Sequence, residues 1–160
     1  MNTADPKLYR PCVGTMLVNA AGLVFVGKRI DNKEGDWWQM PQGGVDPGED
    51  LDKAMLREVG EETGIAERHL EIVATLGREL FYDLPPELQG KLWKGKYVGQ
   101  RQTWYLVRFS GEDSDVRLDA YKHPEFSEFK WVEPALLPDL IVPFKRGIYE
   151  AVVEGFAPKI

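Results

Sequence analysis

The order of apolar and polar residues along the chain predicts alternating strands and helices. Continuous or alternating apolar positions favour strands, whereas apolar positions spaced by three and four favour helices. Strands are predicted over 13–18, 23–28, 37–41, 72–76, 102–109 and 129–132, and helices over 51–63 and 144–153. Strands mixed with two well-spaced helices predict an α/β (α+β) sandwich, in which a mixed β-sheet packs between α-helices.

Glycine, proline and polar residues mark the breaks between these elements. The segment QGGVDPGED, residues 42–50, is predicted to be a turn. Asp50 is suited to cap the helix that follows, Gly64 to end it in a left-handed conformation, and Pro143 to open the last helix. Residues 1–8 are expected to form a loose tail. Because no repeat, low-complexity tract or linker interrupts the chain, we expect a single domain over residues 1–160.

Composition bounds the class of protein. The 160 residues are 43% hydrophobic and 29% charged, as in a soluble globular protein, and no apolar run is long enough to span a membrane. Cys12 is the only cysteine, so no disulfide can form within the chain, and no apolar stretch resembles a secretion signal. We therefore expect a cytoplasmic protein.

The net charge of -6 argues against a protein that coats DNA or RNA without specificity, because such a protein needs a basic face. An anionic substrate remains compatible with this charge if a bound metal and a local basic patch reverse the field at the site. The basic residues that could form this patch are Lys28, Arg29, Lys91, Lys94, Lys96, Arg101, Lys145 and Arg146. The alternative for each of them is ordinary solvated surface.

Three glutamates lie beside the apolar face of the helix predicted over 51–63. On a helical wheel Leu51, Met55 and Val59 form the stripe expected to be buried. The glutamates, which are spaced three and four residues apart, fall within this stripe or at its flank: they are Glu58, Glu61 and Glu62. Like charges at these spacings repel, and partial burial adds a desolvation cost.

A divalent cation would turn this cluster into a site. Clustered carboxylates without cysteine or histidine select a hard ion, Mg²⁺ first, with Mn²⁺ or Ca²⁺ as substitutes. The alternative is a solvated acidic helix end neutralised by Lys53, Arg57 and Arg68.

The residues around these glutamates resemble a known signature. The segment GGVDPGEDLDKAMLREVGEETGI matches every position of the Nudix box, from Gly43 to Gly64 with an aliphatic residue after it. The resemblance implies the Nudix fold and metal-dependent hydrolysis of a phosphoanhydride bond. Its fixed and aliphatic positions are Gly43, Glu49, Arg57, Glu58, Val59, Glu61, Glu62, Gly64 and Ile65.

The resemblance assigns roles to the residues of the box. It implies that Glu58, Glu61 and Glu62 bind the metal ions, and that one glutamate helps to activate the attacking water. Arg57 belongs to the same catalytic set. The glycines permit a close approach and leave the carbonyl of Gly43 free to face the ion, while Glu49, paired with Arg57, and Gly64 are structural.

The resemblance extends beyond the box. The segments YRPCVG, WWQMPQGG, GQRQTWYL, HPEFSEFKWV and VPFKRGIYE are similar to bacterial RNA pyrophosphohydrolases and to the related dinucleoside polyphosphate hydrolases. By this resemblance Glu125 reaches the metal site from outside the box, its alternative being an exposed loop glutamate. The residues implied in substrate binding are Arg10, Arg29, Gln42, Phe144 and Lys145, with Phe144 equally consistent with a core position. Gln100 and Gln102 lie in a matching strand, where ordinary edge polarity is the alternative.

Several choices stay open on the sequence alone. The substrate is 5′-triphosphorylated RNA or a dinucleoside polyphosphate such as diadenosine tetraphosphate, and the alternative to an enzyme is a nucleotide-binding sensor without chemistry. Glu58 is our hypothesis for the general base. The loop 31–36, which is longer than the pattern, and the segment 83–98 match the family least, although they would form the walls that select the substrate. No feature indicates an oligomeric state.

Overall fold

The computed structural model describes residues 8–31 and 35–160. Except for Leu8, the expected tail therefore lies outside the described residues, as does the centre of the loop 31–36. The strands are β1 (Tyr9–Val18), β2 (Val24–Arg29), β3 (Gln42–Gly44), β4 (Leu70–Thr75), β5 (Leu80–Asp83), β6 (Gly99–Phe109) and β7 (Phe126–Val132). The helices are α1 (Leu51–Thr63), α2 (Leu137–Leu140) and α3 (Arg146–Phe156).

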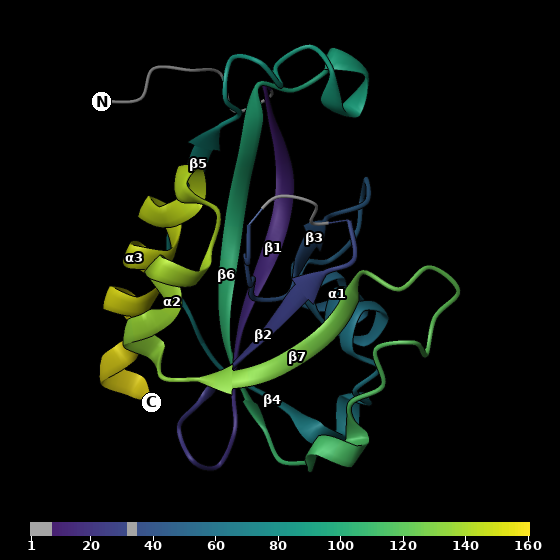
Figure 1. Ribbon diagram of the computed structural model, residues 1–160, viewed down its shortest axis with the longest axis vertical. Helices are drawn as coiled ribbons and strands as arrows, with labels where there is room; N and C mark the ends of the chain where they lie inside the picture. Colours follow the sequence, from purple (N-terminus) through teal and green to yellow (C-terminus); the bar gives the residue numbers. More distant parts are fainter. Residues whose placement is uncertain (1–7, 32–34) are drawn as a thin grey trace.

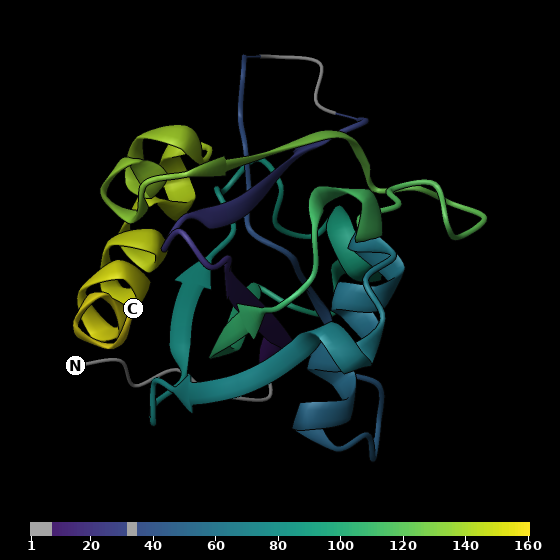
Figure 2. The same cartoon turned by 90° about the horizontal axis from the view of Figure 1, so that it is seen from below.

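The sheet is mixed and lies between the helices, as the sequence predicted. Its order is β4-β6-β1-β2-β7, with β3 paired to β1 and β5 paired to β6. Helices α2 and α3 cover one face of the sheet and α1 covers the other (Figure 1), and the view from below shows the same three layers (Figure 2). In the described part of the chain, no helix is both long and apolar enough to cross a membrane.

Alternation along β1 builds both cores. Met16 packs in the cluster that includes residues of α2 and α3, whereas Val13 and Leu17 pack in the cluster that includes residues of α1. Strand β1 runs parallel to β6 over ten register pairs, from Tyr9 with Gly99 to Val18 with Arg108. Central strands covered on both faces tend to be continuously apolar, which is the pattern that made β1 predictable.

Two predictions before the first long helix were wrong. Residues 37–41 form no strand, since their only ladder contact is a single bridge between Gly27 and Gln39. The strand is instead Gln42–Gly44, which we expected to be a turn and which pairs with Cys12–Gly14 of β1. Glycine pairs weaken the sequence signal for a strand, although glycine is used in strands where another group must approach the backbone closely.

The helix α1 has the predicted bounds and ends. The side chain of Asp50 accepts a hydrogen bond from the backbone N–H of Lys53 at 3.2 Å, and Gly64 adopts a left-handed conformation with φ 72°. Leu51 is a correction, because it is 42% exposed and lines an open hollow. The buried stripe consists of Ala54, Met55, Val59, Glu62 and Thr63.

The last helix begins later than predicted. Residues Pro143–Lys145 form a 3-10 turn, and α3 starts at Arg146. Proline at the first position favours a tight turn as well as a regular helix. The short elements β5 and α2 were not predicted, because four residues carry too little periodicity to define an element.

Candidate active site

Arg57 fixes the loop before α1 to the helix. Its guanidinium donates two hydrogen bonds to the carboxylate of Glu49, at 2.8 and 2.9 Å, and a third to the carbonyl of Gly44 at 2.9 Å. Glu49 also accepts a hydrogen bond from the backbone N–H of Asp46, and these bonds lower the pKa of Glu49 to about 2. The structure thus contains the pairing of Glu49 with Arg57 that the sequence analysis expected.

Glu62 is the most deeply buried of the three helix carboxylates. It is 3% exposed, and its Oε2 accepts a hydrogen bond from the backbone N–H of Gln42 at 3.2 Å. Burial raises its pKa well above the usual range, and the charges of Glu58 and Glu125 add to this shift. The backbone N–H of Gln42 and the charge of Arg29 act in the opposite direction.

Glu58 lies against the backbone of β3. A methyl group built at Gly43 would overlap the Glu58 carboxylate, so only glycine leaves room for this side chain. Burial raises the pKa of Glu58, while the ion pair with Arg57 at 2.9 Å opposes the shift. The glycine pair therefore provides the close approach that the sequence predicted, here between a strand and a carboxylate.

Glu61 and Glu125 occupy the more open side of the cluster. The side chain of Glu61 is 44% exposed and its carboxylate lies 3.3 Å from the same guanidinium nitrogen of Arg57 that contacts Glu58. The side chain of Glu125 is 47% exposed and lies 3.7 Å from Arg29, whose guanidinium also forms two hydrogen bonds with Asp31. Because the charge of Glu125 acts on Glu58 and Glu62, the structure brings this loop residue to the box.

The chemistry of these donors fits a divalent cation. They are carboxylate oxygens, the ligands of hard ions, and burial together with the charges of Glu58 and Glu125 disfavours ionisation of Glu62, which a bound cation would favour. Among the residues that the structure describes, however, no three acidic, histidine or cysteine side chains converge as a ready ligand set. Glu58 and Glu61 point to Arg57 instead, so they would have to turn away from it to bind a metal.

Arg10 lies on the side of β3 opposite to Glu58. Its guanidinium is close enough to Gly44 that a methyl group there would overlap it, and it stacks 5.3 Å from the ring centroid of Trp93. Arg10 thus lies one residue along β3 from the strand position that contacts Glu58. Adjacent strand positions face opposite sides, so β3 separates Arg10 from the Glu58 carboxylate, while Arg10 and Glu49 line the same hollow.

Phe144 and Lys145 lie together against β5. The Phe144 ring, which is 39% exposed, lies 5.8 Å from the ring of Tyr82, and the ammonium group of Lys145 lies 5.5 Å from the same ring. Burial and the nearby charge of Arg29 lower the pKa of Lys145 to about 8. The core alternative for Phe144 is wrong, because its ring is exposed.

The sequence analysis missed two aromatic neighbours of these residues. Tyr82 contacts Phe144 and Lys145, and Trp93 contacts Arg10. The adjacent aromatic residues Phe81 and Tyr82 were a weak sequence signal for the first, and only the structure shows that Tyr82 is buried and Phe81 exposed. Trp93 lies in a segment without regular periodicity and had no comparable signal.

Gln100 and Gln102 are buried rather than ordinary edge residues. The side-chain amide of Gln102 donates to the carbonyl oxygen of Gln100 at 2.8 Å and accepts from the indole N–H of Trp104 at 2.8 Å. This chain of hydrogen bonds satisfies polar groups inside the sheet.

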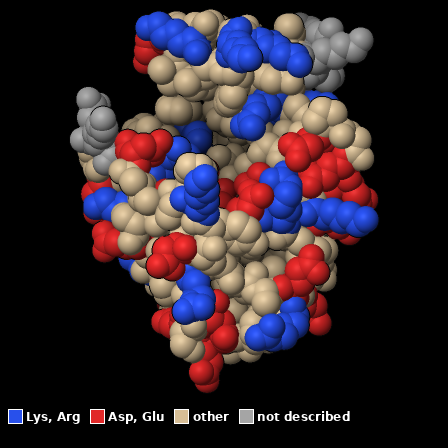
Figure 3. Space-filling model, turned by 90° about the vertical axis from the view of Figure 1, so that its right-hand side faces the viewer, with Lys and Arg blue, Asp and Glu red and all other residues tan. Residues whose placement is uncertain are grey.

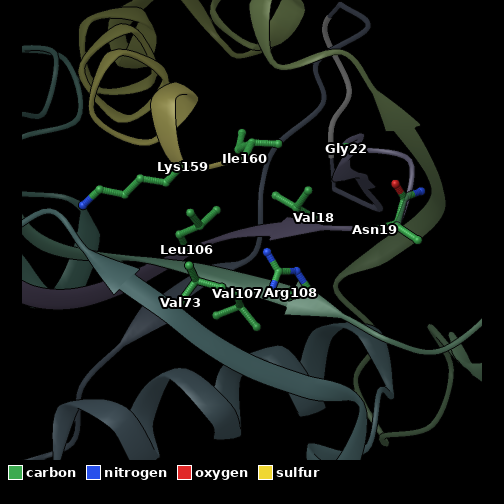
Figure 4. Close-up of a pocket in the computed structure, with 10 residues that line it drawn as sticks. Val18, Asn19, Gly22, Val73, Leu106, Val107, Arg108, Lys159 and Ile160 are labelled. Carbon is green, nitrogen blue, oxygen red and sulfur yellow. The ribbon is translucent and has the colours of Figure 1, made fainter.

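Two hollows differ in their relation to these residues. A cavity of about 130 Å³ near the end of the chain is lined by apolar residues such as Val18, Leu106 and Ile160 (Figure 4) and holds none of the candidate site residues. It is smaller than the roughly 300 Å³ that small-molecule sites need. A hollow of about 520 Å³ is lined by Arg10 and Glu49, and thus adjoins the box.

Comparison with known sequences agrees with the resemblance found for residues 43–65. Residues 8–152 match the family described as NUDIX domain. A protein of Novosphingobium aromaticivorans named RNA pyrophosphohydrolase is 63% identical, over 98% of this chain and 98% of its own length. A protein of Erythrobacter litoralis with the same name is 55% identical, over 92% of this chain and 90% of its own length.

Solved structures share the fold. An Ap4A hydrolase of C. elegans in a binary complex superposes with a TM-score of 0.67 at 23% identity, covering 93% of this chain and 98% of that chain. The dihydroneopterin triphosphate pyrophosphohydrolase of E. coli gives a TM-score of 0.70 at 21% identity, covering 92% and 99%. At these identities the likeness concerns the fold alone.

Proposed function

This chain belongs to the Nudix family of hydrolases, and from that premise we propose that it removes pyrophosphate from the triphosphorylated 5′ end of RNA. The observation that carries the proposal is the near full-length similarity to proteins named RNA pyrophosphohydrolases. Dinucleoside polyphosphates, which present a similar chain of phosphates, are the alternative substrates.

Nudix hydrolases generally use divalent metal cations, and Mg²⁺ is the ion proposed here, with Mn²⁺ as a substitute. Glu58, Glu61, Glu62 and Glu125 would hold it, together with the carbonyl of Gly43, because they supply oxygen ligands around one region of high negative charge. When bound, such an ion stabilises negative charge on phosphate oxygens and makes a bound water more acidic.

The protein's own groups would orient the reaction. Glu58 is our choice of general base, because its carboxylate is held between the backbone of Gly43 and the guanidinium of Arg57. Arg57 is a positioning residue, since it holds Glu49 and the carbonyl of Gly44 and so fixes β3 relative to α1.

Basic and aromatic residues around the cluster suit a nucleotide with several phosphates. Arg29 lies beside Glu125, and the charges of Arg10 and Lys145 act together with that of Glu58 on Cys12, so all three basic residues bring positive charge near the cluster; guanidinium groups match phosphate geometry. The exposed ring of Phe144 offers a surface on which a base can stack. Gln42 completes this set through its side-chain carbonyl oxygen, which is buried and accepts no hydrogen bond from the described residues.

The proposal assigns the protein to the cytoplasm, where its RNA substrate is made. Support comes from Cys12, which is buried as a free thiol in a chain without a second cysteine. DNA and membranes are not part of the proposal.

The test compares products from two substrates under matched conditions. The protein is incubated with 5′-triphosphorylated RNA or with diadenosine tetraphosphate, each with Mg²⁺ and with EDTA, and release of pyrophosphate or ATP is measured. We expect pyrophosphate from RNA, abolished by EDTA, with a larger kcat/KM for RNA than for diadenosine tetraphosphate. A larger kcat/KM for diadenosine tetraphosphate would mean that dinucleoside polyphosphates, and not RNA ends, are the preferred substrates. The absence of product from either substrate would favour a nucleotide-binding protein that is not an enzyme.

A further inference from the structure

We propose that residues 91–97, with the sequence KLWKGKY, form a binding surface for the RNA chain beyond its first nucleotides. We call these residues the lysine segment. This inference rests on the proposed function and deepens it, because it names what distinguishes an RNA end from a dinucleoside polyphosphate. The segment lies within 83–98, the region that resembles the family least.

The lysines of this segment are available to an anionic partner. Lys91, Lys94 and Lys96 are exposed, and none of them forms an ion pair with a carboxylate of the described residues. Several other members of the basic set are already paired. Lys28 pairs with Asp36, Arg101 with Glu79, and Arg146 with Asp139.

The surface of the molecule shows the same contrast. Lysine and arginine side chains predominate at the upper end, above a hollow, with little acidic surface among them, whereas basic and acidic side chains alternate over the rest of that face (Figure 3). The coil that carries residues 84–98 lies at this end of the sheet, beyond β1 and β6 (Figure 1). A patch of one sign attracts phosphates even on an acidic protein, because the field near the patch is local.

Aromatic residues are interleaved with these lysines. The rings of Trp93 and Tyr97 lie 6.1 Å apart in an edge-to-face arrangement, and both are partly exposed. Lys96 lies 5.3 Å from the Tyr97 ring. Lysines between aromatic side chains are the combination that single-stranded nucleic acids need, since lysine follows the backbone and an aromatic ring can stack on a base.

The segment is joined to the candidate active site at defined points. Trp93 stacks on Arg10, and the backbone N–H of Val98 donates to the carbonyl of Leu8 at 2.8 Å. Tyr97 and Arg10 both line the hollow of about 520 Å³ beside the box. A strand whose 5′ phosphates lie near Arg10 could therefore continue past Trp93 and Tyr97 onto the lysines.

The backbone of the segment is held in an unusual conformation. Trp93 and Lys94 have φ values of 53° and 59°, in the left-handed region that side chains other than glycine seldom adopt. Such conformations cluster at ligand-binding surfaces, where they aim side chains. Here they accompany the turn that presents Trp93 to Arg10 and leaves Lys94 exposed.

Only RNA has phosphates that this surface could use. A dinucleoside tetraphosphate consists of two nucleosides joined by its phosphate chain, and carries no phosphate beyond them. RNA adds one phosphate with each nucleotide. The segment should therefore contribute to binding of long RNA, and neither to a triphosphorylated dinucleotide nor to diadenosine tetraphosphate.

The experiment removes the charges and keeps polar, unbranched side chains. The test variant combines Lys91→Gln, Lys94→Gln and Lys96→Gln, and the control combines Arg108→Gln, Lys122→Gln and Lys159→Gln, which are exposed elsewhere and change the net charge equally. Values of kcat/KM are measured on a triphosphorylated 12-nucleotide RNA, a triphosphorylated dinucleotide and diadenosine tetraphosphate, at several salt concentrations.

We expect the test variant to lose about tenfold in kcat/KM on the 12-nucleotide RNA, mainly through KM, with the two short substrates and the control variant changed less than about twofold. The slope of log KM against log salt for the long RNA should fall by about 2, because each of the three lost phosphate contacts on a single strand contributes roughly 0.7 to this slope. Equal losses on all three substrates, or no loss on the long RNA, would overturn the inference.

Failure of the proposed function would be visible separately. If the unmodified protein releases no pyrophosphate from either RNA, the function is wrong, whatever the segment does. Binding of a fluorescent 5′-monophosphorylated 12-nucleotide RNA, measured by anisotropy, then tests whether the lysine segment binds RNA, independently of catalysis. Weaker binding by the test variant than by the control supports the inference, and equal binding contradicts it.

Discussion

The box around α1 and the lysine segment at the end of the sheet organise charge in opposite ways. Arg57 contacts Glu49, Glu58 and Glu61 and the carbonyl of Gly44, so the charges of the box hold one another in place. The lysines of the segment face solvent without such partners among the described residues. The difference suggests a division of labour, in which paired charges fix catalytic geometry and unpaired charges attract an anion.

The largest effect is expected from Glu58→Gln. If Glu58 is the base, this change should lower kcat by about a thousandfold, within the range of general acid–base catalysis, while the fold stays intact. The measurement is turnover of triphosphorylated RNA, with circular dichroism to check the fold. Glu67→Gln, an exposed glutamate just after α1, is the matched control and should change turnover little. Near-normal turnover in Glu58→Gln would show that another group is the base.

The second-largest effect is expected from changing Arg57, which fixes β3 relative to α1. Arg57→Lys keeps the charge but cannot make the forked contact with Glu49 and the bond to Gly44, so kcat/KM should fall by about 10- to 100-fold. Glu49→Gln should have a related effect, and the double variant should be little worse than the more damaged single variant. Fully additive losses would mean that Arg57 and Glu49 act independently and not through their ion pair.

A third prediction tests the close approach at β3. Gly43→Ala places a methyl group where the Glu58 carboxylate lies, so the free energy of unfolding should fall by about 1–3 kcal/mol, with a loss of turnover. Gly147→Ala in α3 is the control, because a methyl group there meets open space, and it should stabilise the protein by about 0.5–1 kcal/mol. Urea unfolding measures both. Unchanged stability in Gly43→Ala would show that Glu58 is not held against the strand.

The smallest effect concerns Lys145, a positive charge that is partly buried and, like the lysine segment, has no carboxylate partner among the described residues. Its pKa is about 8, below the ordinary lysine value of 10.5, so from pH 8 upward the folded protein releases a proton that the unfolded chain keeps. The contribution of Lys145 to stability should therefore rise with pH over this window, by on the order of 1 kcal/mol after solvent screening.

The measurement for Lys145 is the difference in unfolding free energy between the protein and Lys145→Met at pH 7 and pH 9. Arg29, Cys12 and Tyr82 are the titratable or charged groups around it. The raised pKa values of Cys12, about 11, and of Tyr82 keep both groups neutral in the folded protein over this range. Comparison with the variant removes their own contributions. A difference that falls with pH would contradict the prediction.

The sequence predicted the parts of the fold that depend on long periodic runs. Strand β1 and helix α1 carry enough apolar positions to be recognised, and α1 has the predicted ends at Asp50 and Gly64. Residues 37–44 were assigned wrongly, because the short strand β3 contains two glycines and its partner lies in β1, about 30 residues earlier in the chain. Leu51 was assigned to the core, although packing leaves it at an open hollow.

By itself the sequence determined that three carboxylates gather on one side of α1 and that Arg57 can reach Glu61, because a helix fixes which residues are neighbours within one or two turns. Local pattern did not place Glu125 beside them; the family resemblance implied this position and the tertiary structure brings the residue there. Only the tertiary structure decided that Tyr82 meets Phe144 and Lys145, and that Trp93 covers Arg10. These contacts join elements far apart in the chain, and their distances follow from strand register and the path of loops, which no local pattern encodes.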